Sequence, residues 1–133
     1  MKILYIDHGG VVSDSHMYQY YGDLYRELKS LANVTLYEGP VFEIHNLLSH
    51  FPDVFDCIIF GLGYFAQGNP QVYRKIDGLS ELNIPVVAML HKPQNLLAEK
   101  LEFCKINNMD LLLDSQSTYQ DHGRIANTKS IRS

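Results

Sequence analysis

The chain has 133 residues, of which 46% are hydrophobic and 20% charged, and its formal net charge is -4. This length suits a single domain with one core, and the composition excludes an intrinsically disordered protein. Because the 11 lysines and arginines are scattered along an acidic chain, we expect no nucleic-acid partner.

Short apolar runs of strand length recur along the chain. They are residues 2–6 (KILYI), 34–37 (VTLY), 56–60 (DCIIF), 85–90 (PVVAML) and 110–113 (DLLL). Each run fits a β-strand. The closing residues 128–133 (TKSIRS) would add a sixth strand beside the fifth.

Segments with helical spacing of apolar residues separate these runs. The four stripes are Met17, Tyr21, Leu24, Leu28 and Leu31; Ile44, Leu47, Leu48 and Phe51; Val72, Ile76 and Leu79; and Leu97, Leu101 and Cys104. Local signals agree, because Asn69 before Pro70 is typical of a helix start. The pair Asn107-Asn108 suits a left-handed helix end.

Alternation of strands and helices predicts a parallel sheet with helices on both faces. The first, third and fourth runs are apolar on consecutive residues, whereas VTLYE (34–38) alternates as an edge strand does. We therefore expect one three-layer, Rossmann-like, doubly wound α/β domain over residues 1–133, with strand order 2-1-3-4-5 and the sixth strand as an optional addition.

The two cysteines, Cys57 and Cys104, stand in apolar settings typical of reduced core thiols, which favours a reducing compartment. The N-terminal MKILYID is too short for a signal peptide, and no run is long enough to cross a bilayer. We expect a cytoplasmic protein without a transmembrane segment.

In such a sheet, ligands bind beyond the carboxyl ends of the strands, where the strand order reverses between strands one and three. The loops at that point are DHGGVVSDSH (7–16) and GLGYFAQGN (61–69). Glycines such as Gly9, Gly10 and Gly63 let backbone N–H groups approach a ligand, or simply turn the chain. Neither dinucleotide nor phosphate-loop fingerprints are present.

Other polar and aromatic residues accompany these glycines. His8 would act as an acid, a base or a hydroxyl partner, or as a structural hydrogen-bonding group. Tyr64, with Phe65, forms either an aromatic wall for a ligand ring or part of the core. Asp7 either accepts bonds from a ligand hydroxyl or caps its own loop.

The fourth run delivers HKP (91–93) to the same edge of the sheet. His91 supplies a titratable ring and Lys92 a positive charge, where anions or sugar hydroxyls would bind; the alternative is a solvated surface loop. Ser115, after the fifth run, offers a hydroxyl for a ligand or for a helix cap.

Three other site types lack support. The six histidines and two cysteines show no metal-ligand spacing, and no nucleophile elbow occurs, so we expect no metal and no cofactor. A phosphorylation receiver would need an aspartate where the third run ends in Phe60-Gly61. Flavodoxin-like binding of FMN remains an alternative, with Ser13, Ser15 and Tyr64 around the cofactor.

Several stretches together resemble one family. MKILYID followed by two glycines, PVVAMLHKP (85–93), KLEFCKINNMDLLLDSQSTY (100–119) and NTKSIR (127–132) are similar to the N-terminal domain of GT-B-fold glycosyltransferases. The resemblance is strongest to family 4-like and CgeB-like spore-maturation members. It implies that the chain belongs to a glycosyltransferase and binds a sugar or glycan acceptor.

The resemblance also assigns roles to residues. His8, Gly9 and Gly10 would face the sugar or diphosphate, His91 would bond or deprotonate an acceptor hydroxyl, and Lys92 would offset phosphate charge. The nucleotide-sugar donor would be held by a C-terminal domain or a partner chain. We expect the chain alone to be inactive, with a non-catalytic interaction module as a further alternative.

Overall fold

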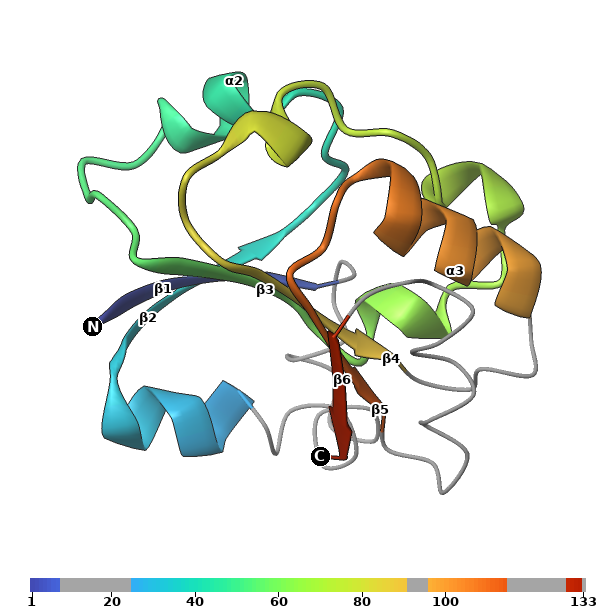
Figure 1. Ribbon diagram of the computed structural model, residues 1–133. Helices are drawn as coiled ribbons and strands as arrows, with labels where there is room; N and C mark the ends of the chain where they lie inside the picture. The colour runs from blue at the N-terminus through green and yellow to red at the C-terminus, as the bar shows by residue number, and fades with distance from the viewer. Residues whose placement is uncertain (8–24, 91–95, 115–128, 133) are drawn as a thin grey trace.

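The computed structural model describes residues 1–7, 25–90, 96–114 and 129–132. Over these residues the chain forms one sheet of six parallel strands in the order β2-β1-β3-β4-β5-β6 (Figure 1). The strands are β1 Lys2–Asp7, β2 Asn33–Glu38, β3 Cys57–Phe60, β4 Val86–Leu90, β5 Leu111–Asp114 and β6 Lys129–Arg132. The predicted α/β fold and strand order are confirmed, and the sixth strand pairs with the fifth.

The strand registers bring the carboxyl ends of four strands to one edge of the sheet. Ile6 of β1 pairs with Tyr37 of β2 and with Phe60 of β3, and Phe60 pairs in turn with Ala88 of β4. The consecutive apolar residues of β1, β3 and β4 are largely buried, whereas β2 is half-buried along the sheet edge. The carboxyl ends of β1, β3 and β4, after which the predicted site residues follow, therefore lie side by side.

One face of the sheet is covered by a helix over residues 25–31 (Figure 1). Tyr25, Leu28 and Ala32 pack against a buried layer that includes Tyr5, and the rings of Tyr5 and Tyr25 lie 5.6 Å apart. Leu31, which the helical spacing predicts on the buried stripe, is 80% exposed. The prediction for Leu31 was wrong because the inward stripe ends at Ala32 instead, one residue further along the chain.

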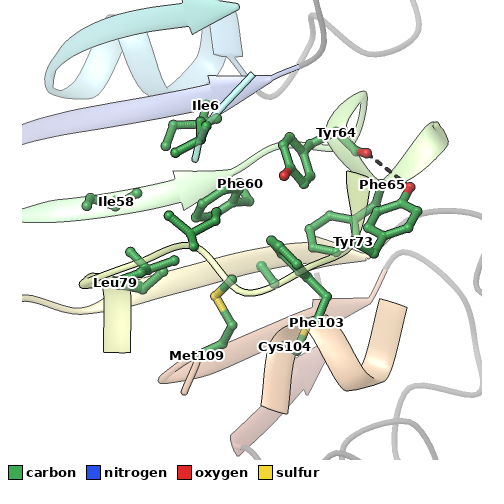
Figure 2. Close-up of a cluster of buried hydrophobic side chains, with 14 of the residues drawn as sticks. Ile6, Ile58, Phe60, Tyr64, Phe65, Tyr73, Leu79, Phe103, Cys104 and Met109 are labelled. Atoms are coloured by element: carbon green, nitrogen blue, oxygen red, sulfur yellow. Dashed lines mark hydrogen bonds between the residues drawn. The ribbon is translucent and has the colours of Figure 1, made fainter. Parts of the chain in front are cut away.

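The opposite face carries α2 Ile44–Leu48, α3 Leu97–Ile106 and three short 3-10 turns, η1 Tyr64–Ala66, η2 Pro70–Val72 and η3 Leu79–Glu81 (Figure 1). Their apolar side chains fill the larger core shown in Figure 2. The expected stripes of α2 and α3 are confirmed, because Ile44, Leu47, Leu101 and Cys104 are all buried.

The predicted helix over Val72, Ile76 and Leu79 does not form as one element. Asn69 does cap a proline-initiated turn, since its Oδ1 accepts from Gln71 N at 3.1 Å, but η2 ends at Val72. Beyond it, Asn107 Oδ1 accepts the N–H of Ile76 at 2.8 Å, and Gly78 has a φ of 82°. The hydrogen bond with Asn107 takes the place of a helical bond of the Ile76 N–H, and the left-handed conformation of Gly78 is incompatible with a helix. Tertiary contacts therefore prevent the helix that the apolar spacing predicts.

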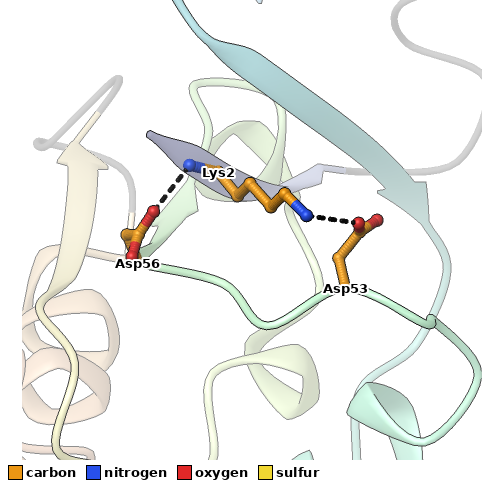
Figure 3. Close-up of polar contacts among 3 residues, drawn as sticks. All are labelled: Lys2, Asp53 and Asp56. Atoms are coloured by element: carbon orange, nitrogen blue, oxygen red, sulfur yellow. Dashed lines mark hydrogen bonds and ion pairs between the residues drawn. The ribbon is translucent and has the colours of Figure 1, made fainter.

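At the opposite, amino edge of the sheet, Lys2 ties the start of β1 to the segment before β3 (Figure 3). Its backbone N–H donates to Asp56 Oδ2 at 2.8 Å, and its Nζ lies 3.1 Å from Asp53 Oδ1. The ion pair is partly solvent-exposed, so it contributes little to stability.

Among the described residues, no helix combines the length and the apolar character that crossing a bilayer requires.

Candidate functional site at the carboxyl edge of the sheet

A pocket of about 540 Å³ lies at the carboxyl edge of β1 and β2, beside the segment that follows β3. This volume is within the range of small-molecule sites. Its lining consists of Asp7, Glu38, Gly39, Pro40, Val41, Phe42, Tyr64, Gln67, Asn69, Gln71, Val72 and Arg74. The pocket therefore adjoins the switch point between β1 and β3, where the strand order predicts a ligand.

The first wall comes from the ends of two neighbouring strands. Asp7 is the last residue of β1 and is fully buried, and its register partner in β2 is Glu38, which is half-buried. Because the two strands are parallel and in register, both acidic residues reach the same edge. The chain then continues through residues 39–42, which complete this wall.

The second wall is residues 64–74, which the aromatic core holds in place. Tyr73 Oη donates to Tyr64 O at 3.1 Å, as Figure 2 shows. It also donates to Gln67 O at 2.8 Å, and Tyr64 Oη donates to Val72 O at 3.2 Å. Burial raises the pKa of both phenols well above the ordinary tyrosine value, so both stay protonated donors at neutral pH. The second wall is thus pre-organised.

Several polar groups of the second wall remain available to a ligand. Gln67 Nε2 donates to Tyr64 O at 3.1 Å, which leaves its Oε1 as an acceptor. Asn69 uses its Oδ1 for the η2 cap, which leaves its amide N–H groups. The side chain of Gln71 is exposed and has no hydrogen-bond partner within the described parts of the chain.

Arg74 and Phe42 meet across the pocket rim. The guanidinium carbon of Arg74 lies 4.2 Å from the centroid of the Phe42 ring, and both side chains are exposed. The cation–π contact joins the two walls and keeps the five donors of the guanidinium beside the pocket.

Of the predicted site residues, the structure describes Gly63 and Tyr64 but not the other six. Tyr64 is part of the buried core and also lines the pocket, and its contact with a ligand ring remains a prediction. Gly63 is buried at the start of η1 and is not part of the lining. His8, Gly9, Gly10, His91, Lys92 and Ser115 lie outside the described residues, and their roles remain predictions.

Most of the lining was not singled out from the sequence. The sequence points to the loops after strands one, three, four and five, whereas the end of β2 supplies Glu38 and the segment after β2 supplies Phe42. Its position was implied by the strand order, since a parallel edge strand also ends at the carboxyl edge. No local motif marked Gln67, Gln71 or Arg74.

The described residues contain no group of three or more histidine, cysteine, aspartate or glutamate side chains arranged to hold a metal ion. Comparison with family models, with curated proteins and with solved structures finds no match to this chain. The function is therefore argued from the pocket itself.

Proposed function

We propose that the chain binds a sugar or glycan acceptor and supplies the acceptor side of a sugar-transfer cleft of the GT-B type. In this proposal a second domain or a partner chain holds the nucleotide-sugar donor. The observation that carries the proposal is a pocket at the carboxyl edge of β1 and β2 with polar side chains on both walls and available hydrogen-bonding groups on the second. The family resemblance of the sequence supports the same conclusion.

The pocket chemistry suits a polyhydroxyl ligand because each sugar hydroxyl both donates and accepts a hydrogen bond. The first wall contains the acidic side chains of Asp7 and Glu38. The second wall offers the amide N–H groups of Asn69 and the Arg74 guanidinium as donors, and Oε1 of Gln67 as an acceptor. Apolar contact comes from Tyr64 and Val72. A few oriented polar groups on an apolar lining are typical of small-molecule sites.

The same lining is poorly suited to a nucleotide diphosphate. Among the described lining residues, two are acidic and one is basic, so a multiply charged anion gains little there. We expect donor affinity in the millimolar range or weaker, which corresponds to about 4 kcal/mol of binding free energy.

The decisive experiment is a titration of the ¹⁵N-labelled chain with a panel of saccharides, followed by NMR. The panel holds methyl glycosides of glucose, galactose, mannose and N-acetylglucosamine together with matching di- and trisaccharides. We expect at least one to shift the backbone amides of Gly39, Gln67 and Gln71. The variant Asn69→Asp keeps the oxygen that caps η2 but loses the amide donors, so it should weaken binding by about tenfold.

The matched control is Asn83→Asp, the same change at an exposed position before β4, at the amino edge of the sheet. It should leave the saccharide affinity unchanged. Failure of every saccharide in the panel to bind would overturn the proposal and favour an interaction module. Nanomolar affinity for a sugar nucleotide in calorimetry would contradict the proposal that this chain supplies only the acceptor side of the cleft. Copurification of a yellow flavin would favour the FMN alternative.

A further inference from the structure

A second, smaller hollow of about 170 Å³ lies next to the main pocket. It is lined by Tyr37, Pro40, Val41, Phe42, Glu43, Asn46, Leu47 and His50. The segment Pro40, Val41 and Phe42 lines both hollows. The two hollows therefore lie next to each other along this segment.

Three polar side chains of the smaller hollow are still able to bind, and hydrogen bonds orient two of them, Tyr37 and His50. His50 Nδ1 lies 2.8 Å from Asn46 O, and because a carbonyl only accepts, Nδ1 carries a proton. Nε2 is left for a ligand, as an acceptor when the ring is neutral and as a donor when the ring is protonated. Tyr37 Oη donates to Pro40 O at 2.9 Å and can still accept. The Asn46 side-chain amide has no hydrogen-bond partner among the residues that the structure describes.

Glu43 has a different task in the same hollow. Its two carboxylate oxygens accept the backbone N–H groups of His45 at 2.9 Å and of Asn46 at 2.7 Å, which caps the start of α2. These hydrogen bonds lower the pKa of the Glu43 carboxyl. Glu43 therefore stabilises the start of the helix that carries Asn46, and we assign it no role in ligand binding.

Phe42 stands between the two hollows as an apolar platform. Its side chain is 57% exposed, and the contact with Arg74 restrains the ring. Exposing a large aromatic ring to water is unfavourable, so covering it with the C–H face of a sugar ring would contribute to binding.

We infer that the smaller hollow is a second saccharide subsite, so that the ligand is an oligosaccharide of at least two rings, with one ring in each hollow and the linkage passing over Phe42. The inference rests on the proposed function, because it extends the same ligand beyond the main pocket. It assigns hydroxyl-binding roles to Asn46 and His50.

The test compares methyl glycosides with the matching di- and trisaccharides of the panel on the unmodified chain and on Asn46→Ala. The oligosaccharide should bind at least tenfold more tightly than the methyl glycoside, and it alone should shift the amides of Asn46 and His50. Asn46→Ala should lower oligosaccharide affinity about fivefold, the loss of one hydrogen bond, and change methyl-glycoside affinity less than twofold. Asn83→Ala is the matched control and should change neither affinity.

Phe42→Ala gives a second, independent readout. It should reduce the preference for the oligosaccharide over the methyl glycoside, because the platform lies on the route between the hollows. Equal affinities for short and long saccharides, or oligosaccharide shifts confined to the main pocket, would overturn the second subsite and leave the proposed function intact. If no saccharide in the panel binds, the proposed function fails and the inference fails with it.

Discussion

Gly61, directly after β3, faces the ring of Tyr5 on the neighbouring strand β1. A Cβ atom at Gly61 would lie 2.5 Å from Tyr5 Oη and 2.6 Å from its Cζ. Tyr5 is fully buried and in contact with Tyr25, so its ring has little room to move aside. The glycine is therefore required by packing, at the strand exit that adjoins the candidate site.

Replacing Gly61 by Ala should destabilise the protein by about 1–3 kcal/mol, the usual cost of overpacking a core. Chemical denaturation followed by circular dichroism measures the change. Gly68→Ala is the matched control, because nothing lies within 4 Å of a Cβ atom there, and it should change the stability by less than about 0.5 kcal/mol. Equal effects of the two substitutions would show that the close approach to Tyr5 carries no cost.

The residues that form the site were only partly predictable one by one. Tyr64 was identifiable because it follows a buried strand in a glycine-rich loop, a common place for ligand contacts. Gln67 lies in the same loop, whereas Gln71 and Arg74 lie beyond it. No motif distinguishes these three residues, since amide and guanidinium side chains are ordinary on any surface. Only the packing of Tyr73 against the backbone of residues 64 and 67 turns their segment toward the pocket.

At the scale of elements, Asn107 connects the end of α3 to the segment between η2 and η3. Its fully buried side chain accepts from Ile76 N at 2.8 Å and donates to Arg74 O at 3.1 Å and to Phe103 O at 2.9 Å. One side chain thereby satisfies backbone groups of two elements. This bridge also holds the part of the chain that carries Arg74 to the pocket.

Asn107→Ala should destabilise the protein by about 2–4 kcal/mol, because it leaves a buried N–H and carbonyl groups without partners. Urea unfolding measures the total change. Hydrogen exchange at the Ile76 amide, which should accelerate, assigns the change to this bridge. Asn83→Ala provides the exposed comparison, and a loss at Asn107 no larger than the loss at Asn83 would contradict the structural role.

The same bridge explains why one predicted element was wrong. Apolar residues 72, 76 and 79 have helical spacing, yet the backbone around Ile76 is bonded to Asn107 of a distant helix. Periodicity reports which side chains are buried, and here Ile76 and Leu79 are indeed buried. It does not report where the backbone hydrogen bonds go, and those decide the secondary structure.

At the scale of the whole molecule, the two cysteines lie on opposite faces of the sheet and differ in their burial. Cys104 is fully buried in the core on the α3 face, and burial raises the pKa of its thiol to about 12. Cys57 is half-buried on the opposite face, and burial raises its pKa as well.

At pH 8, we expect Cys104 of the native protein to react with iodoacetamide only through unfolding, because its thiol is fully buried and burial also raises its pKa. Mass spectrometry should show Cys57 modified first, with both cysteines modified quickly in urea. The modification rate of Cys104 should rise in Gly61→Ala and stay unchanged in Gly68→Ala. Native alkylation of Cys104 at the rate of Cys57 would contradict its burial.

The sequence by itself determined the α/β class, the parallel sheet and the strand order, because the spacing of apolar residues along the chain fixes which faces each element must bury. It also indicated the edge of the sheet at which the candidate pocket lies, since the carboxyl ends of parallel strands meet there. Only the tertiary structure decided that the segment after β2 forms a wall, that residues 72–79 break into short turns, and that Phe42 meets Arg74. These features arise from contacts between residues far apart in the chain, and local patterns carry no information about which distant groups will supply the hydrogen bonds.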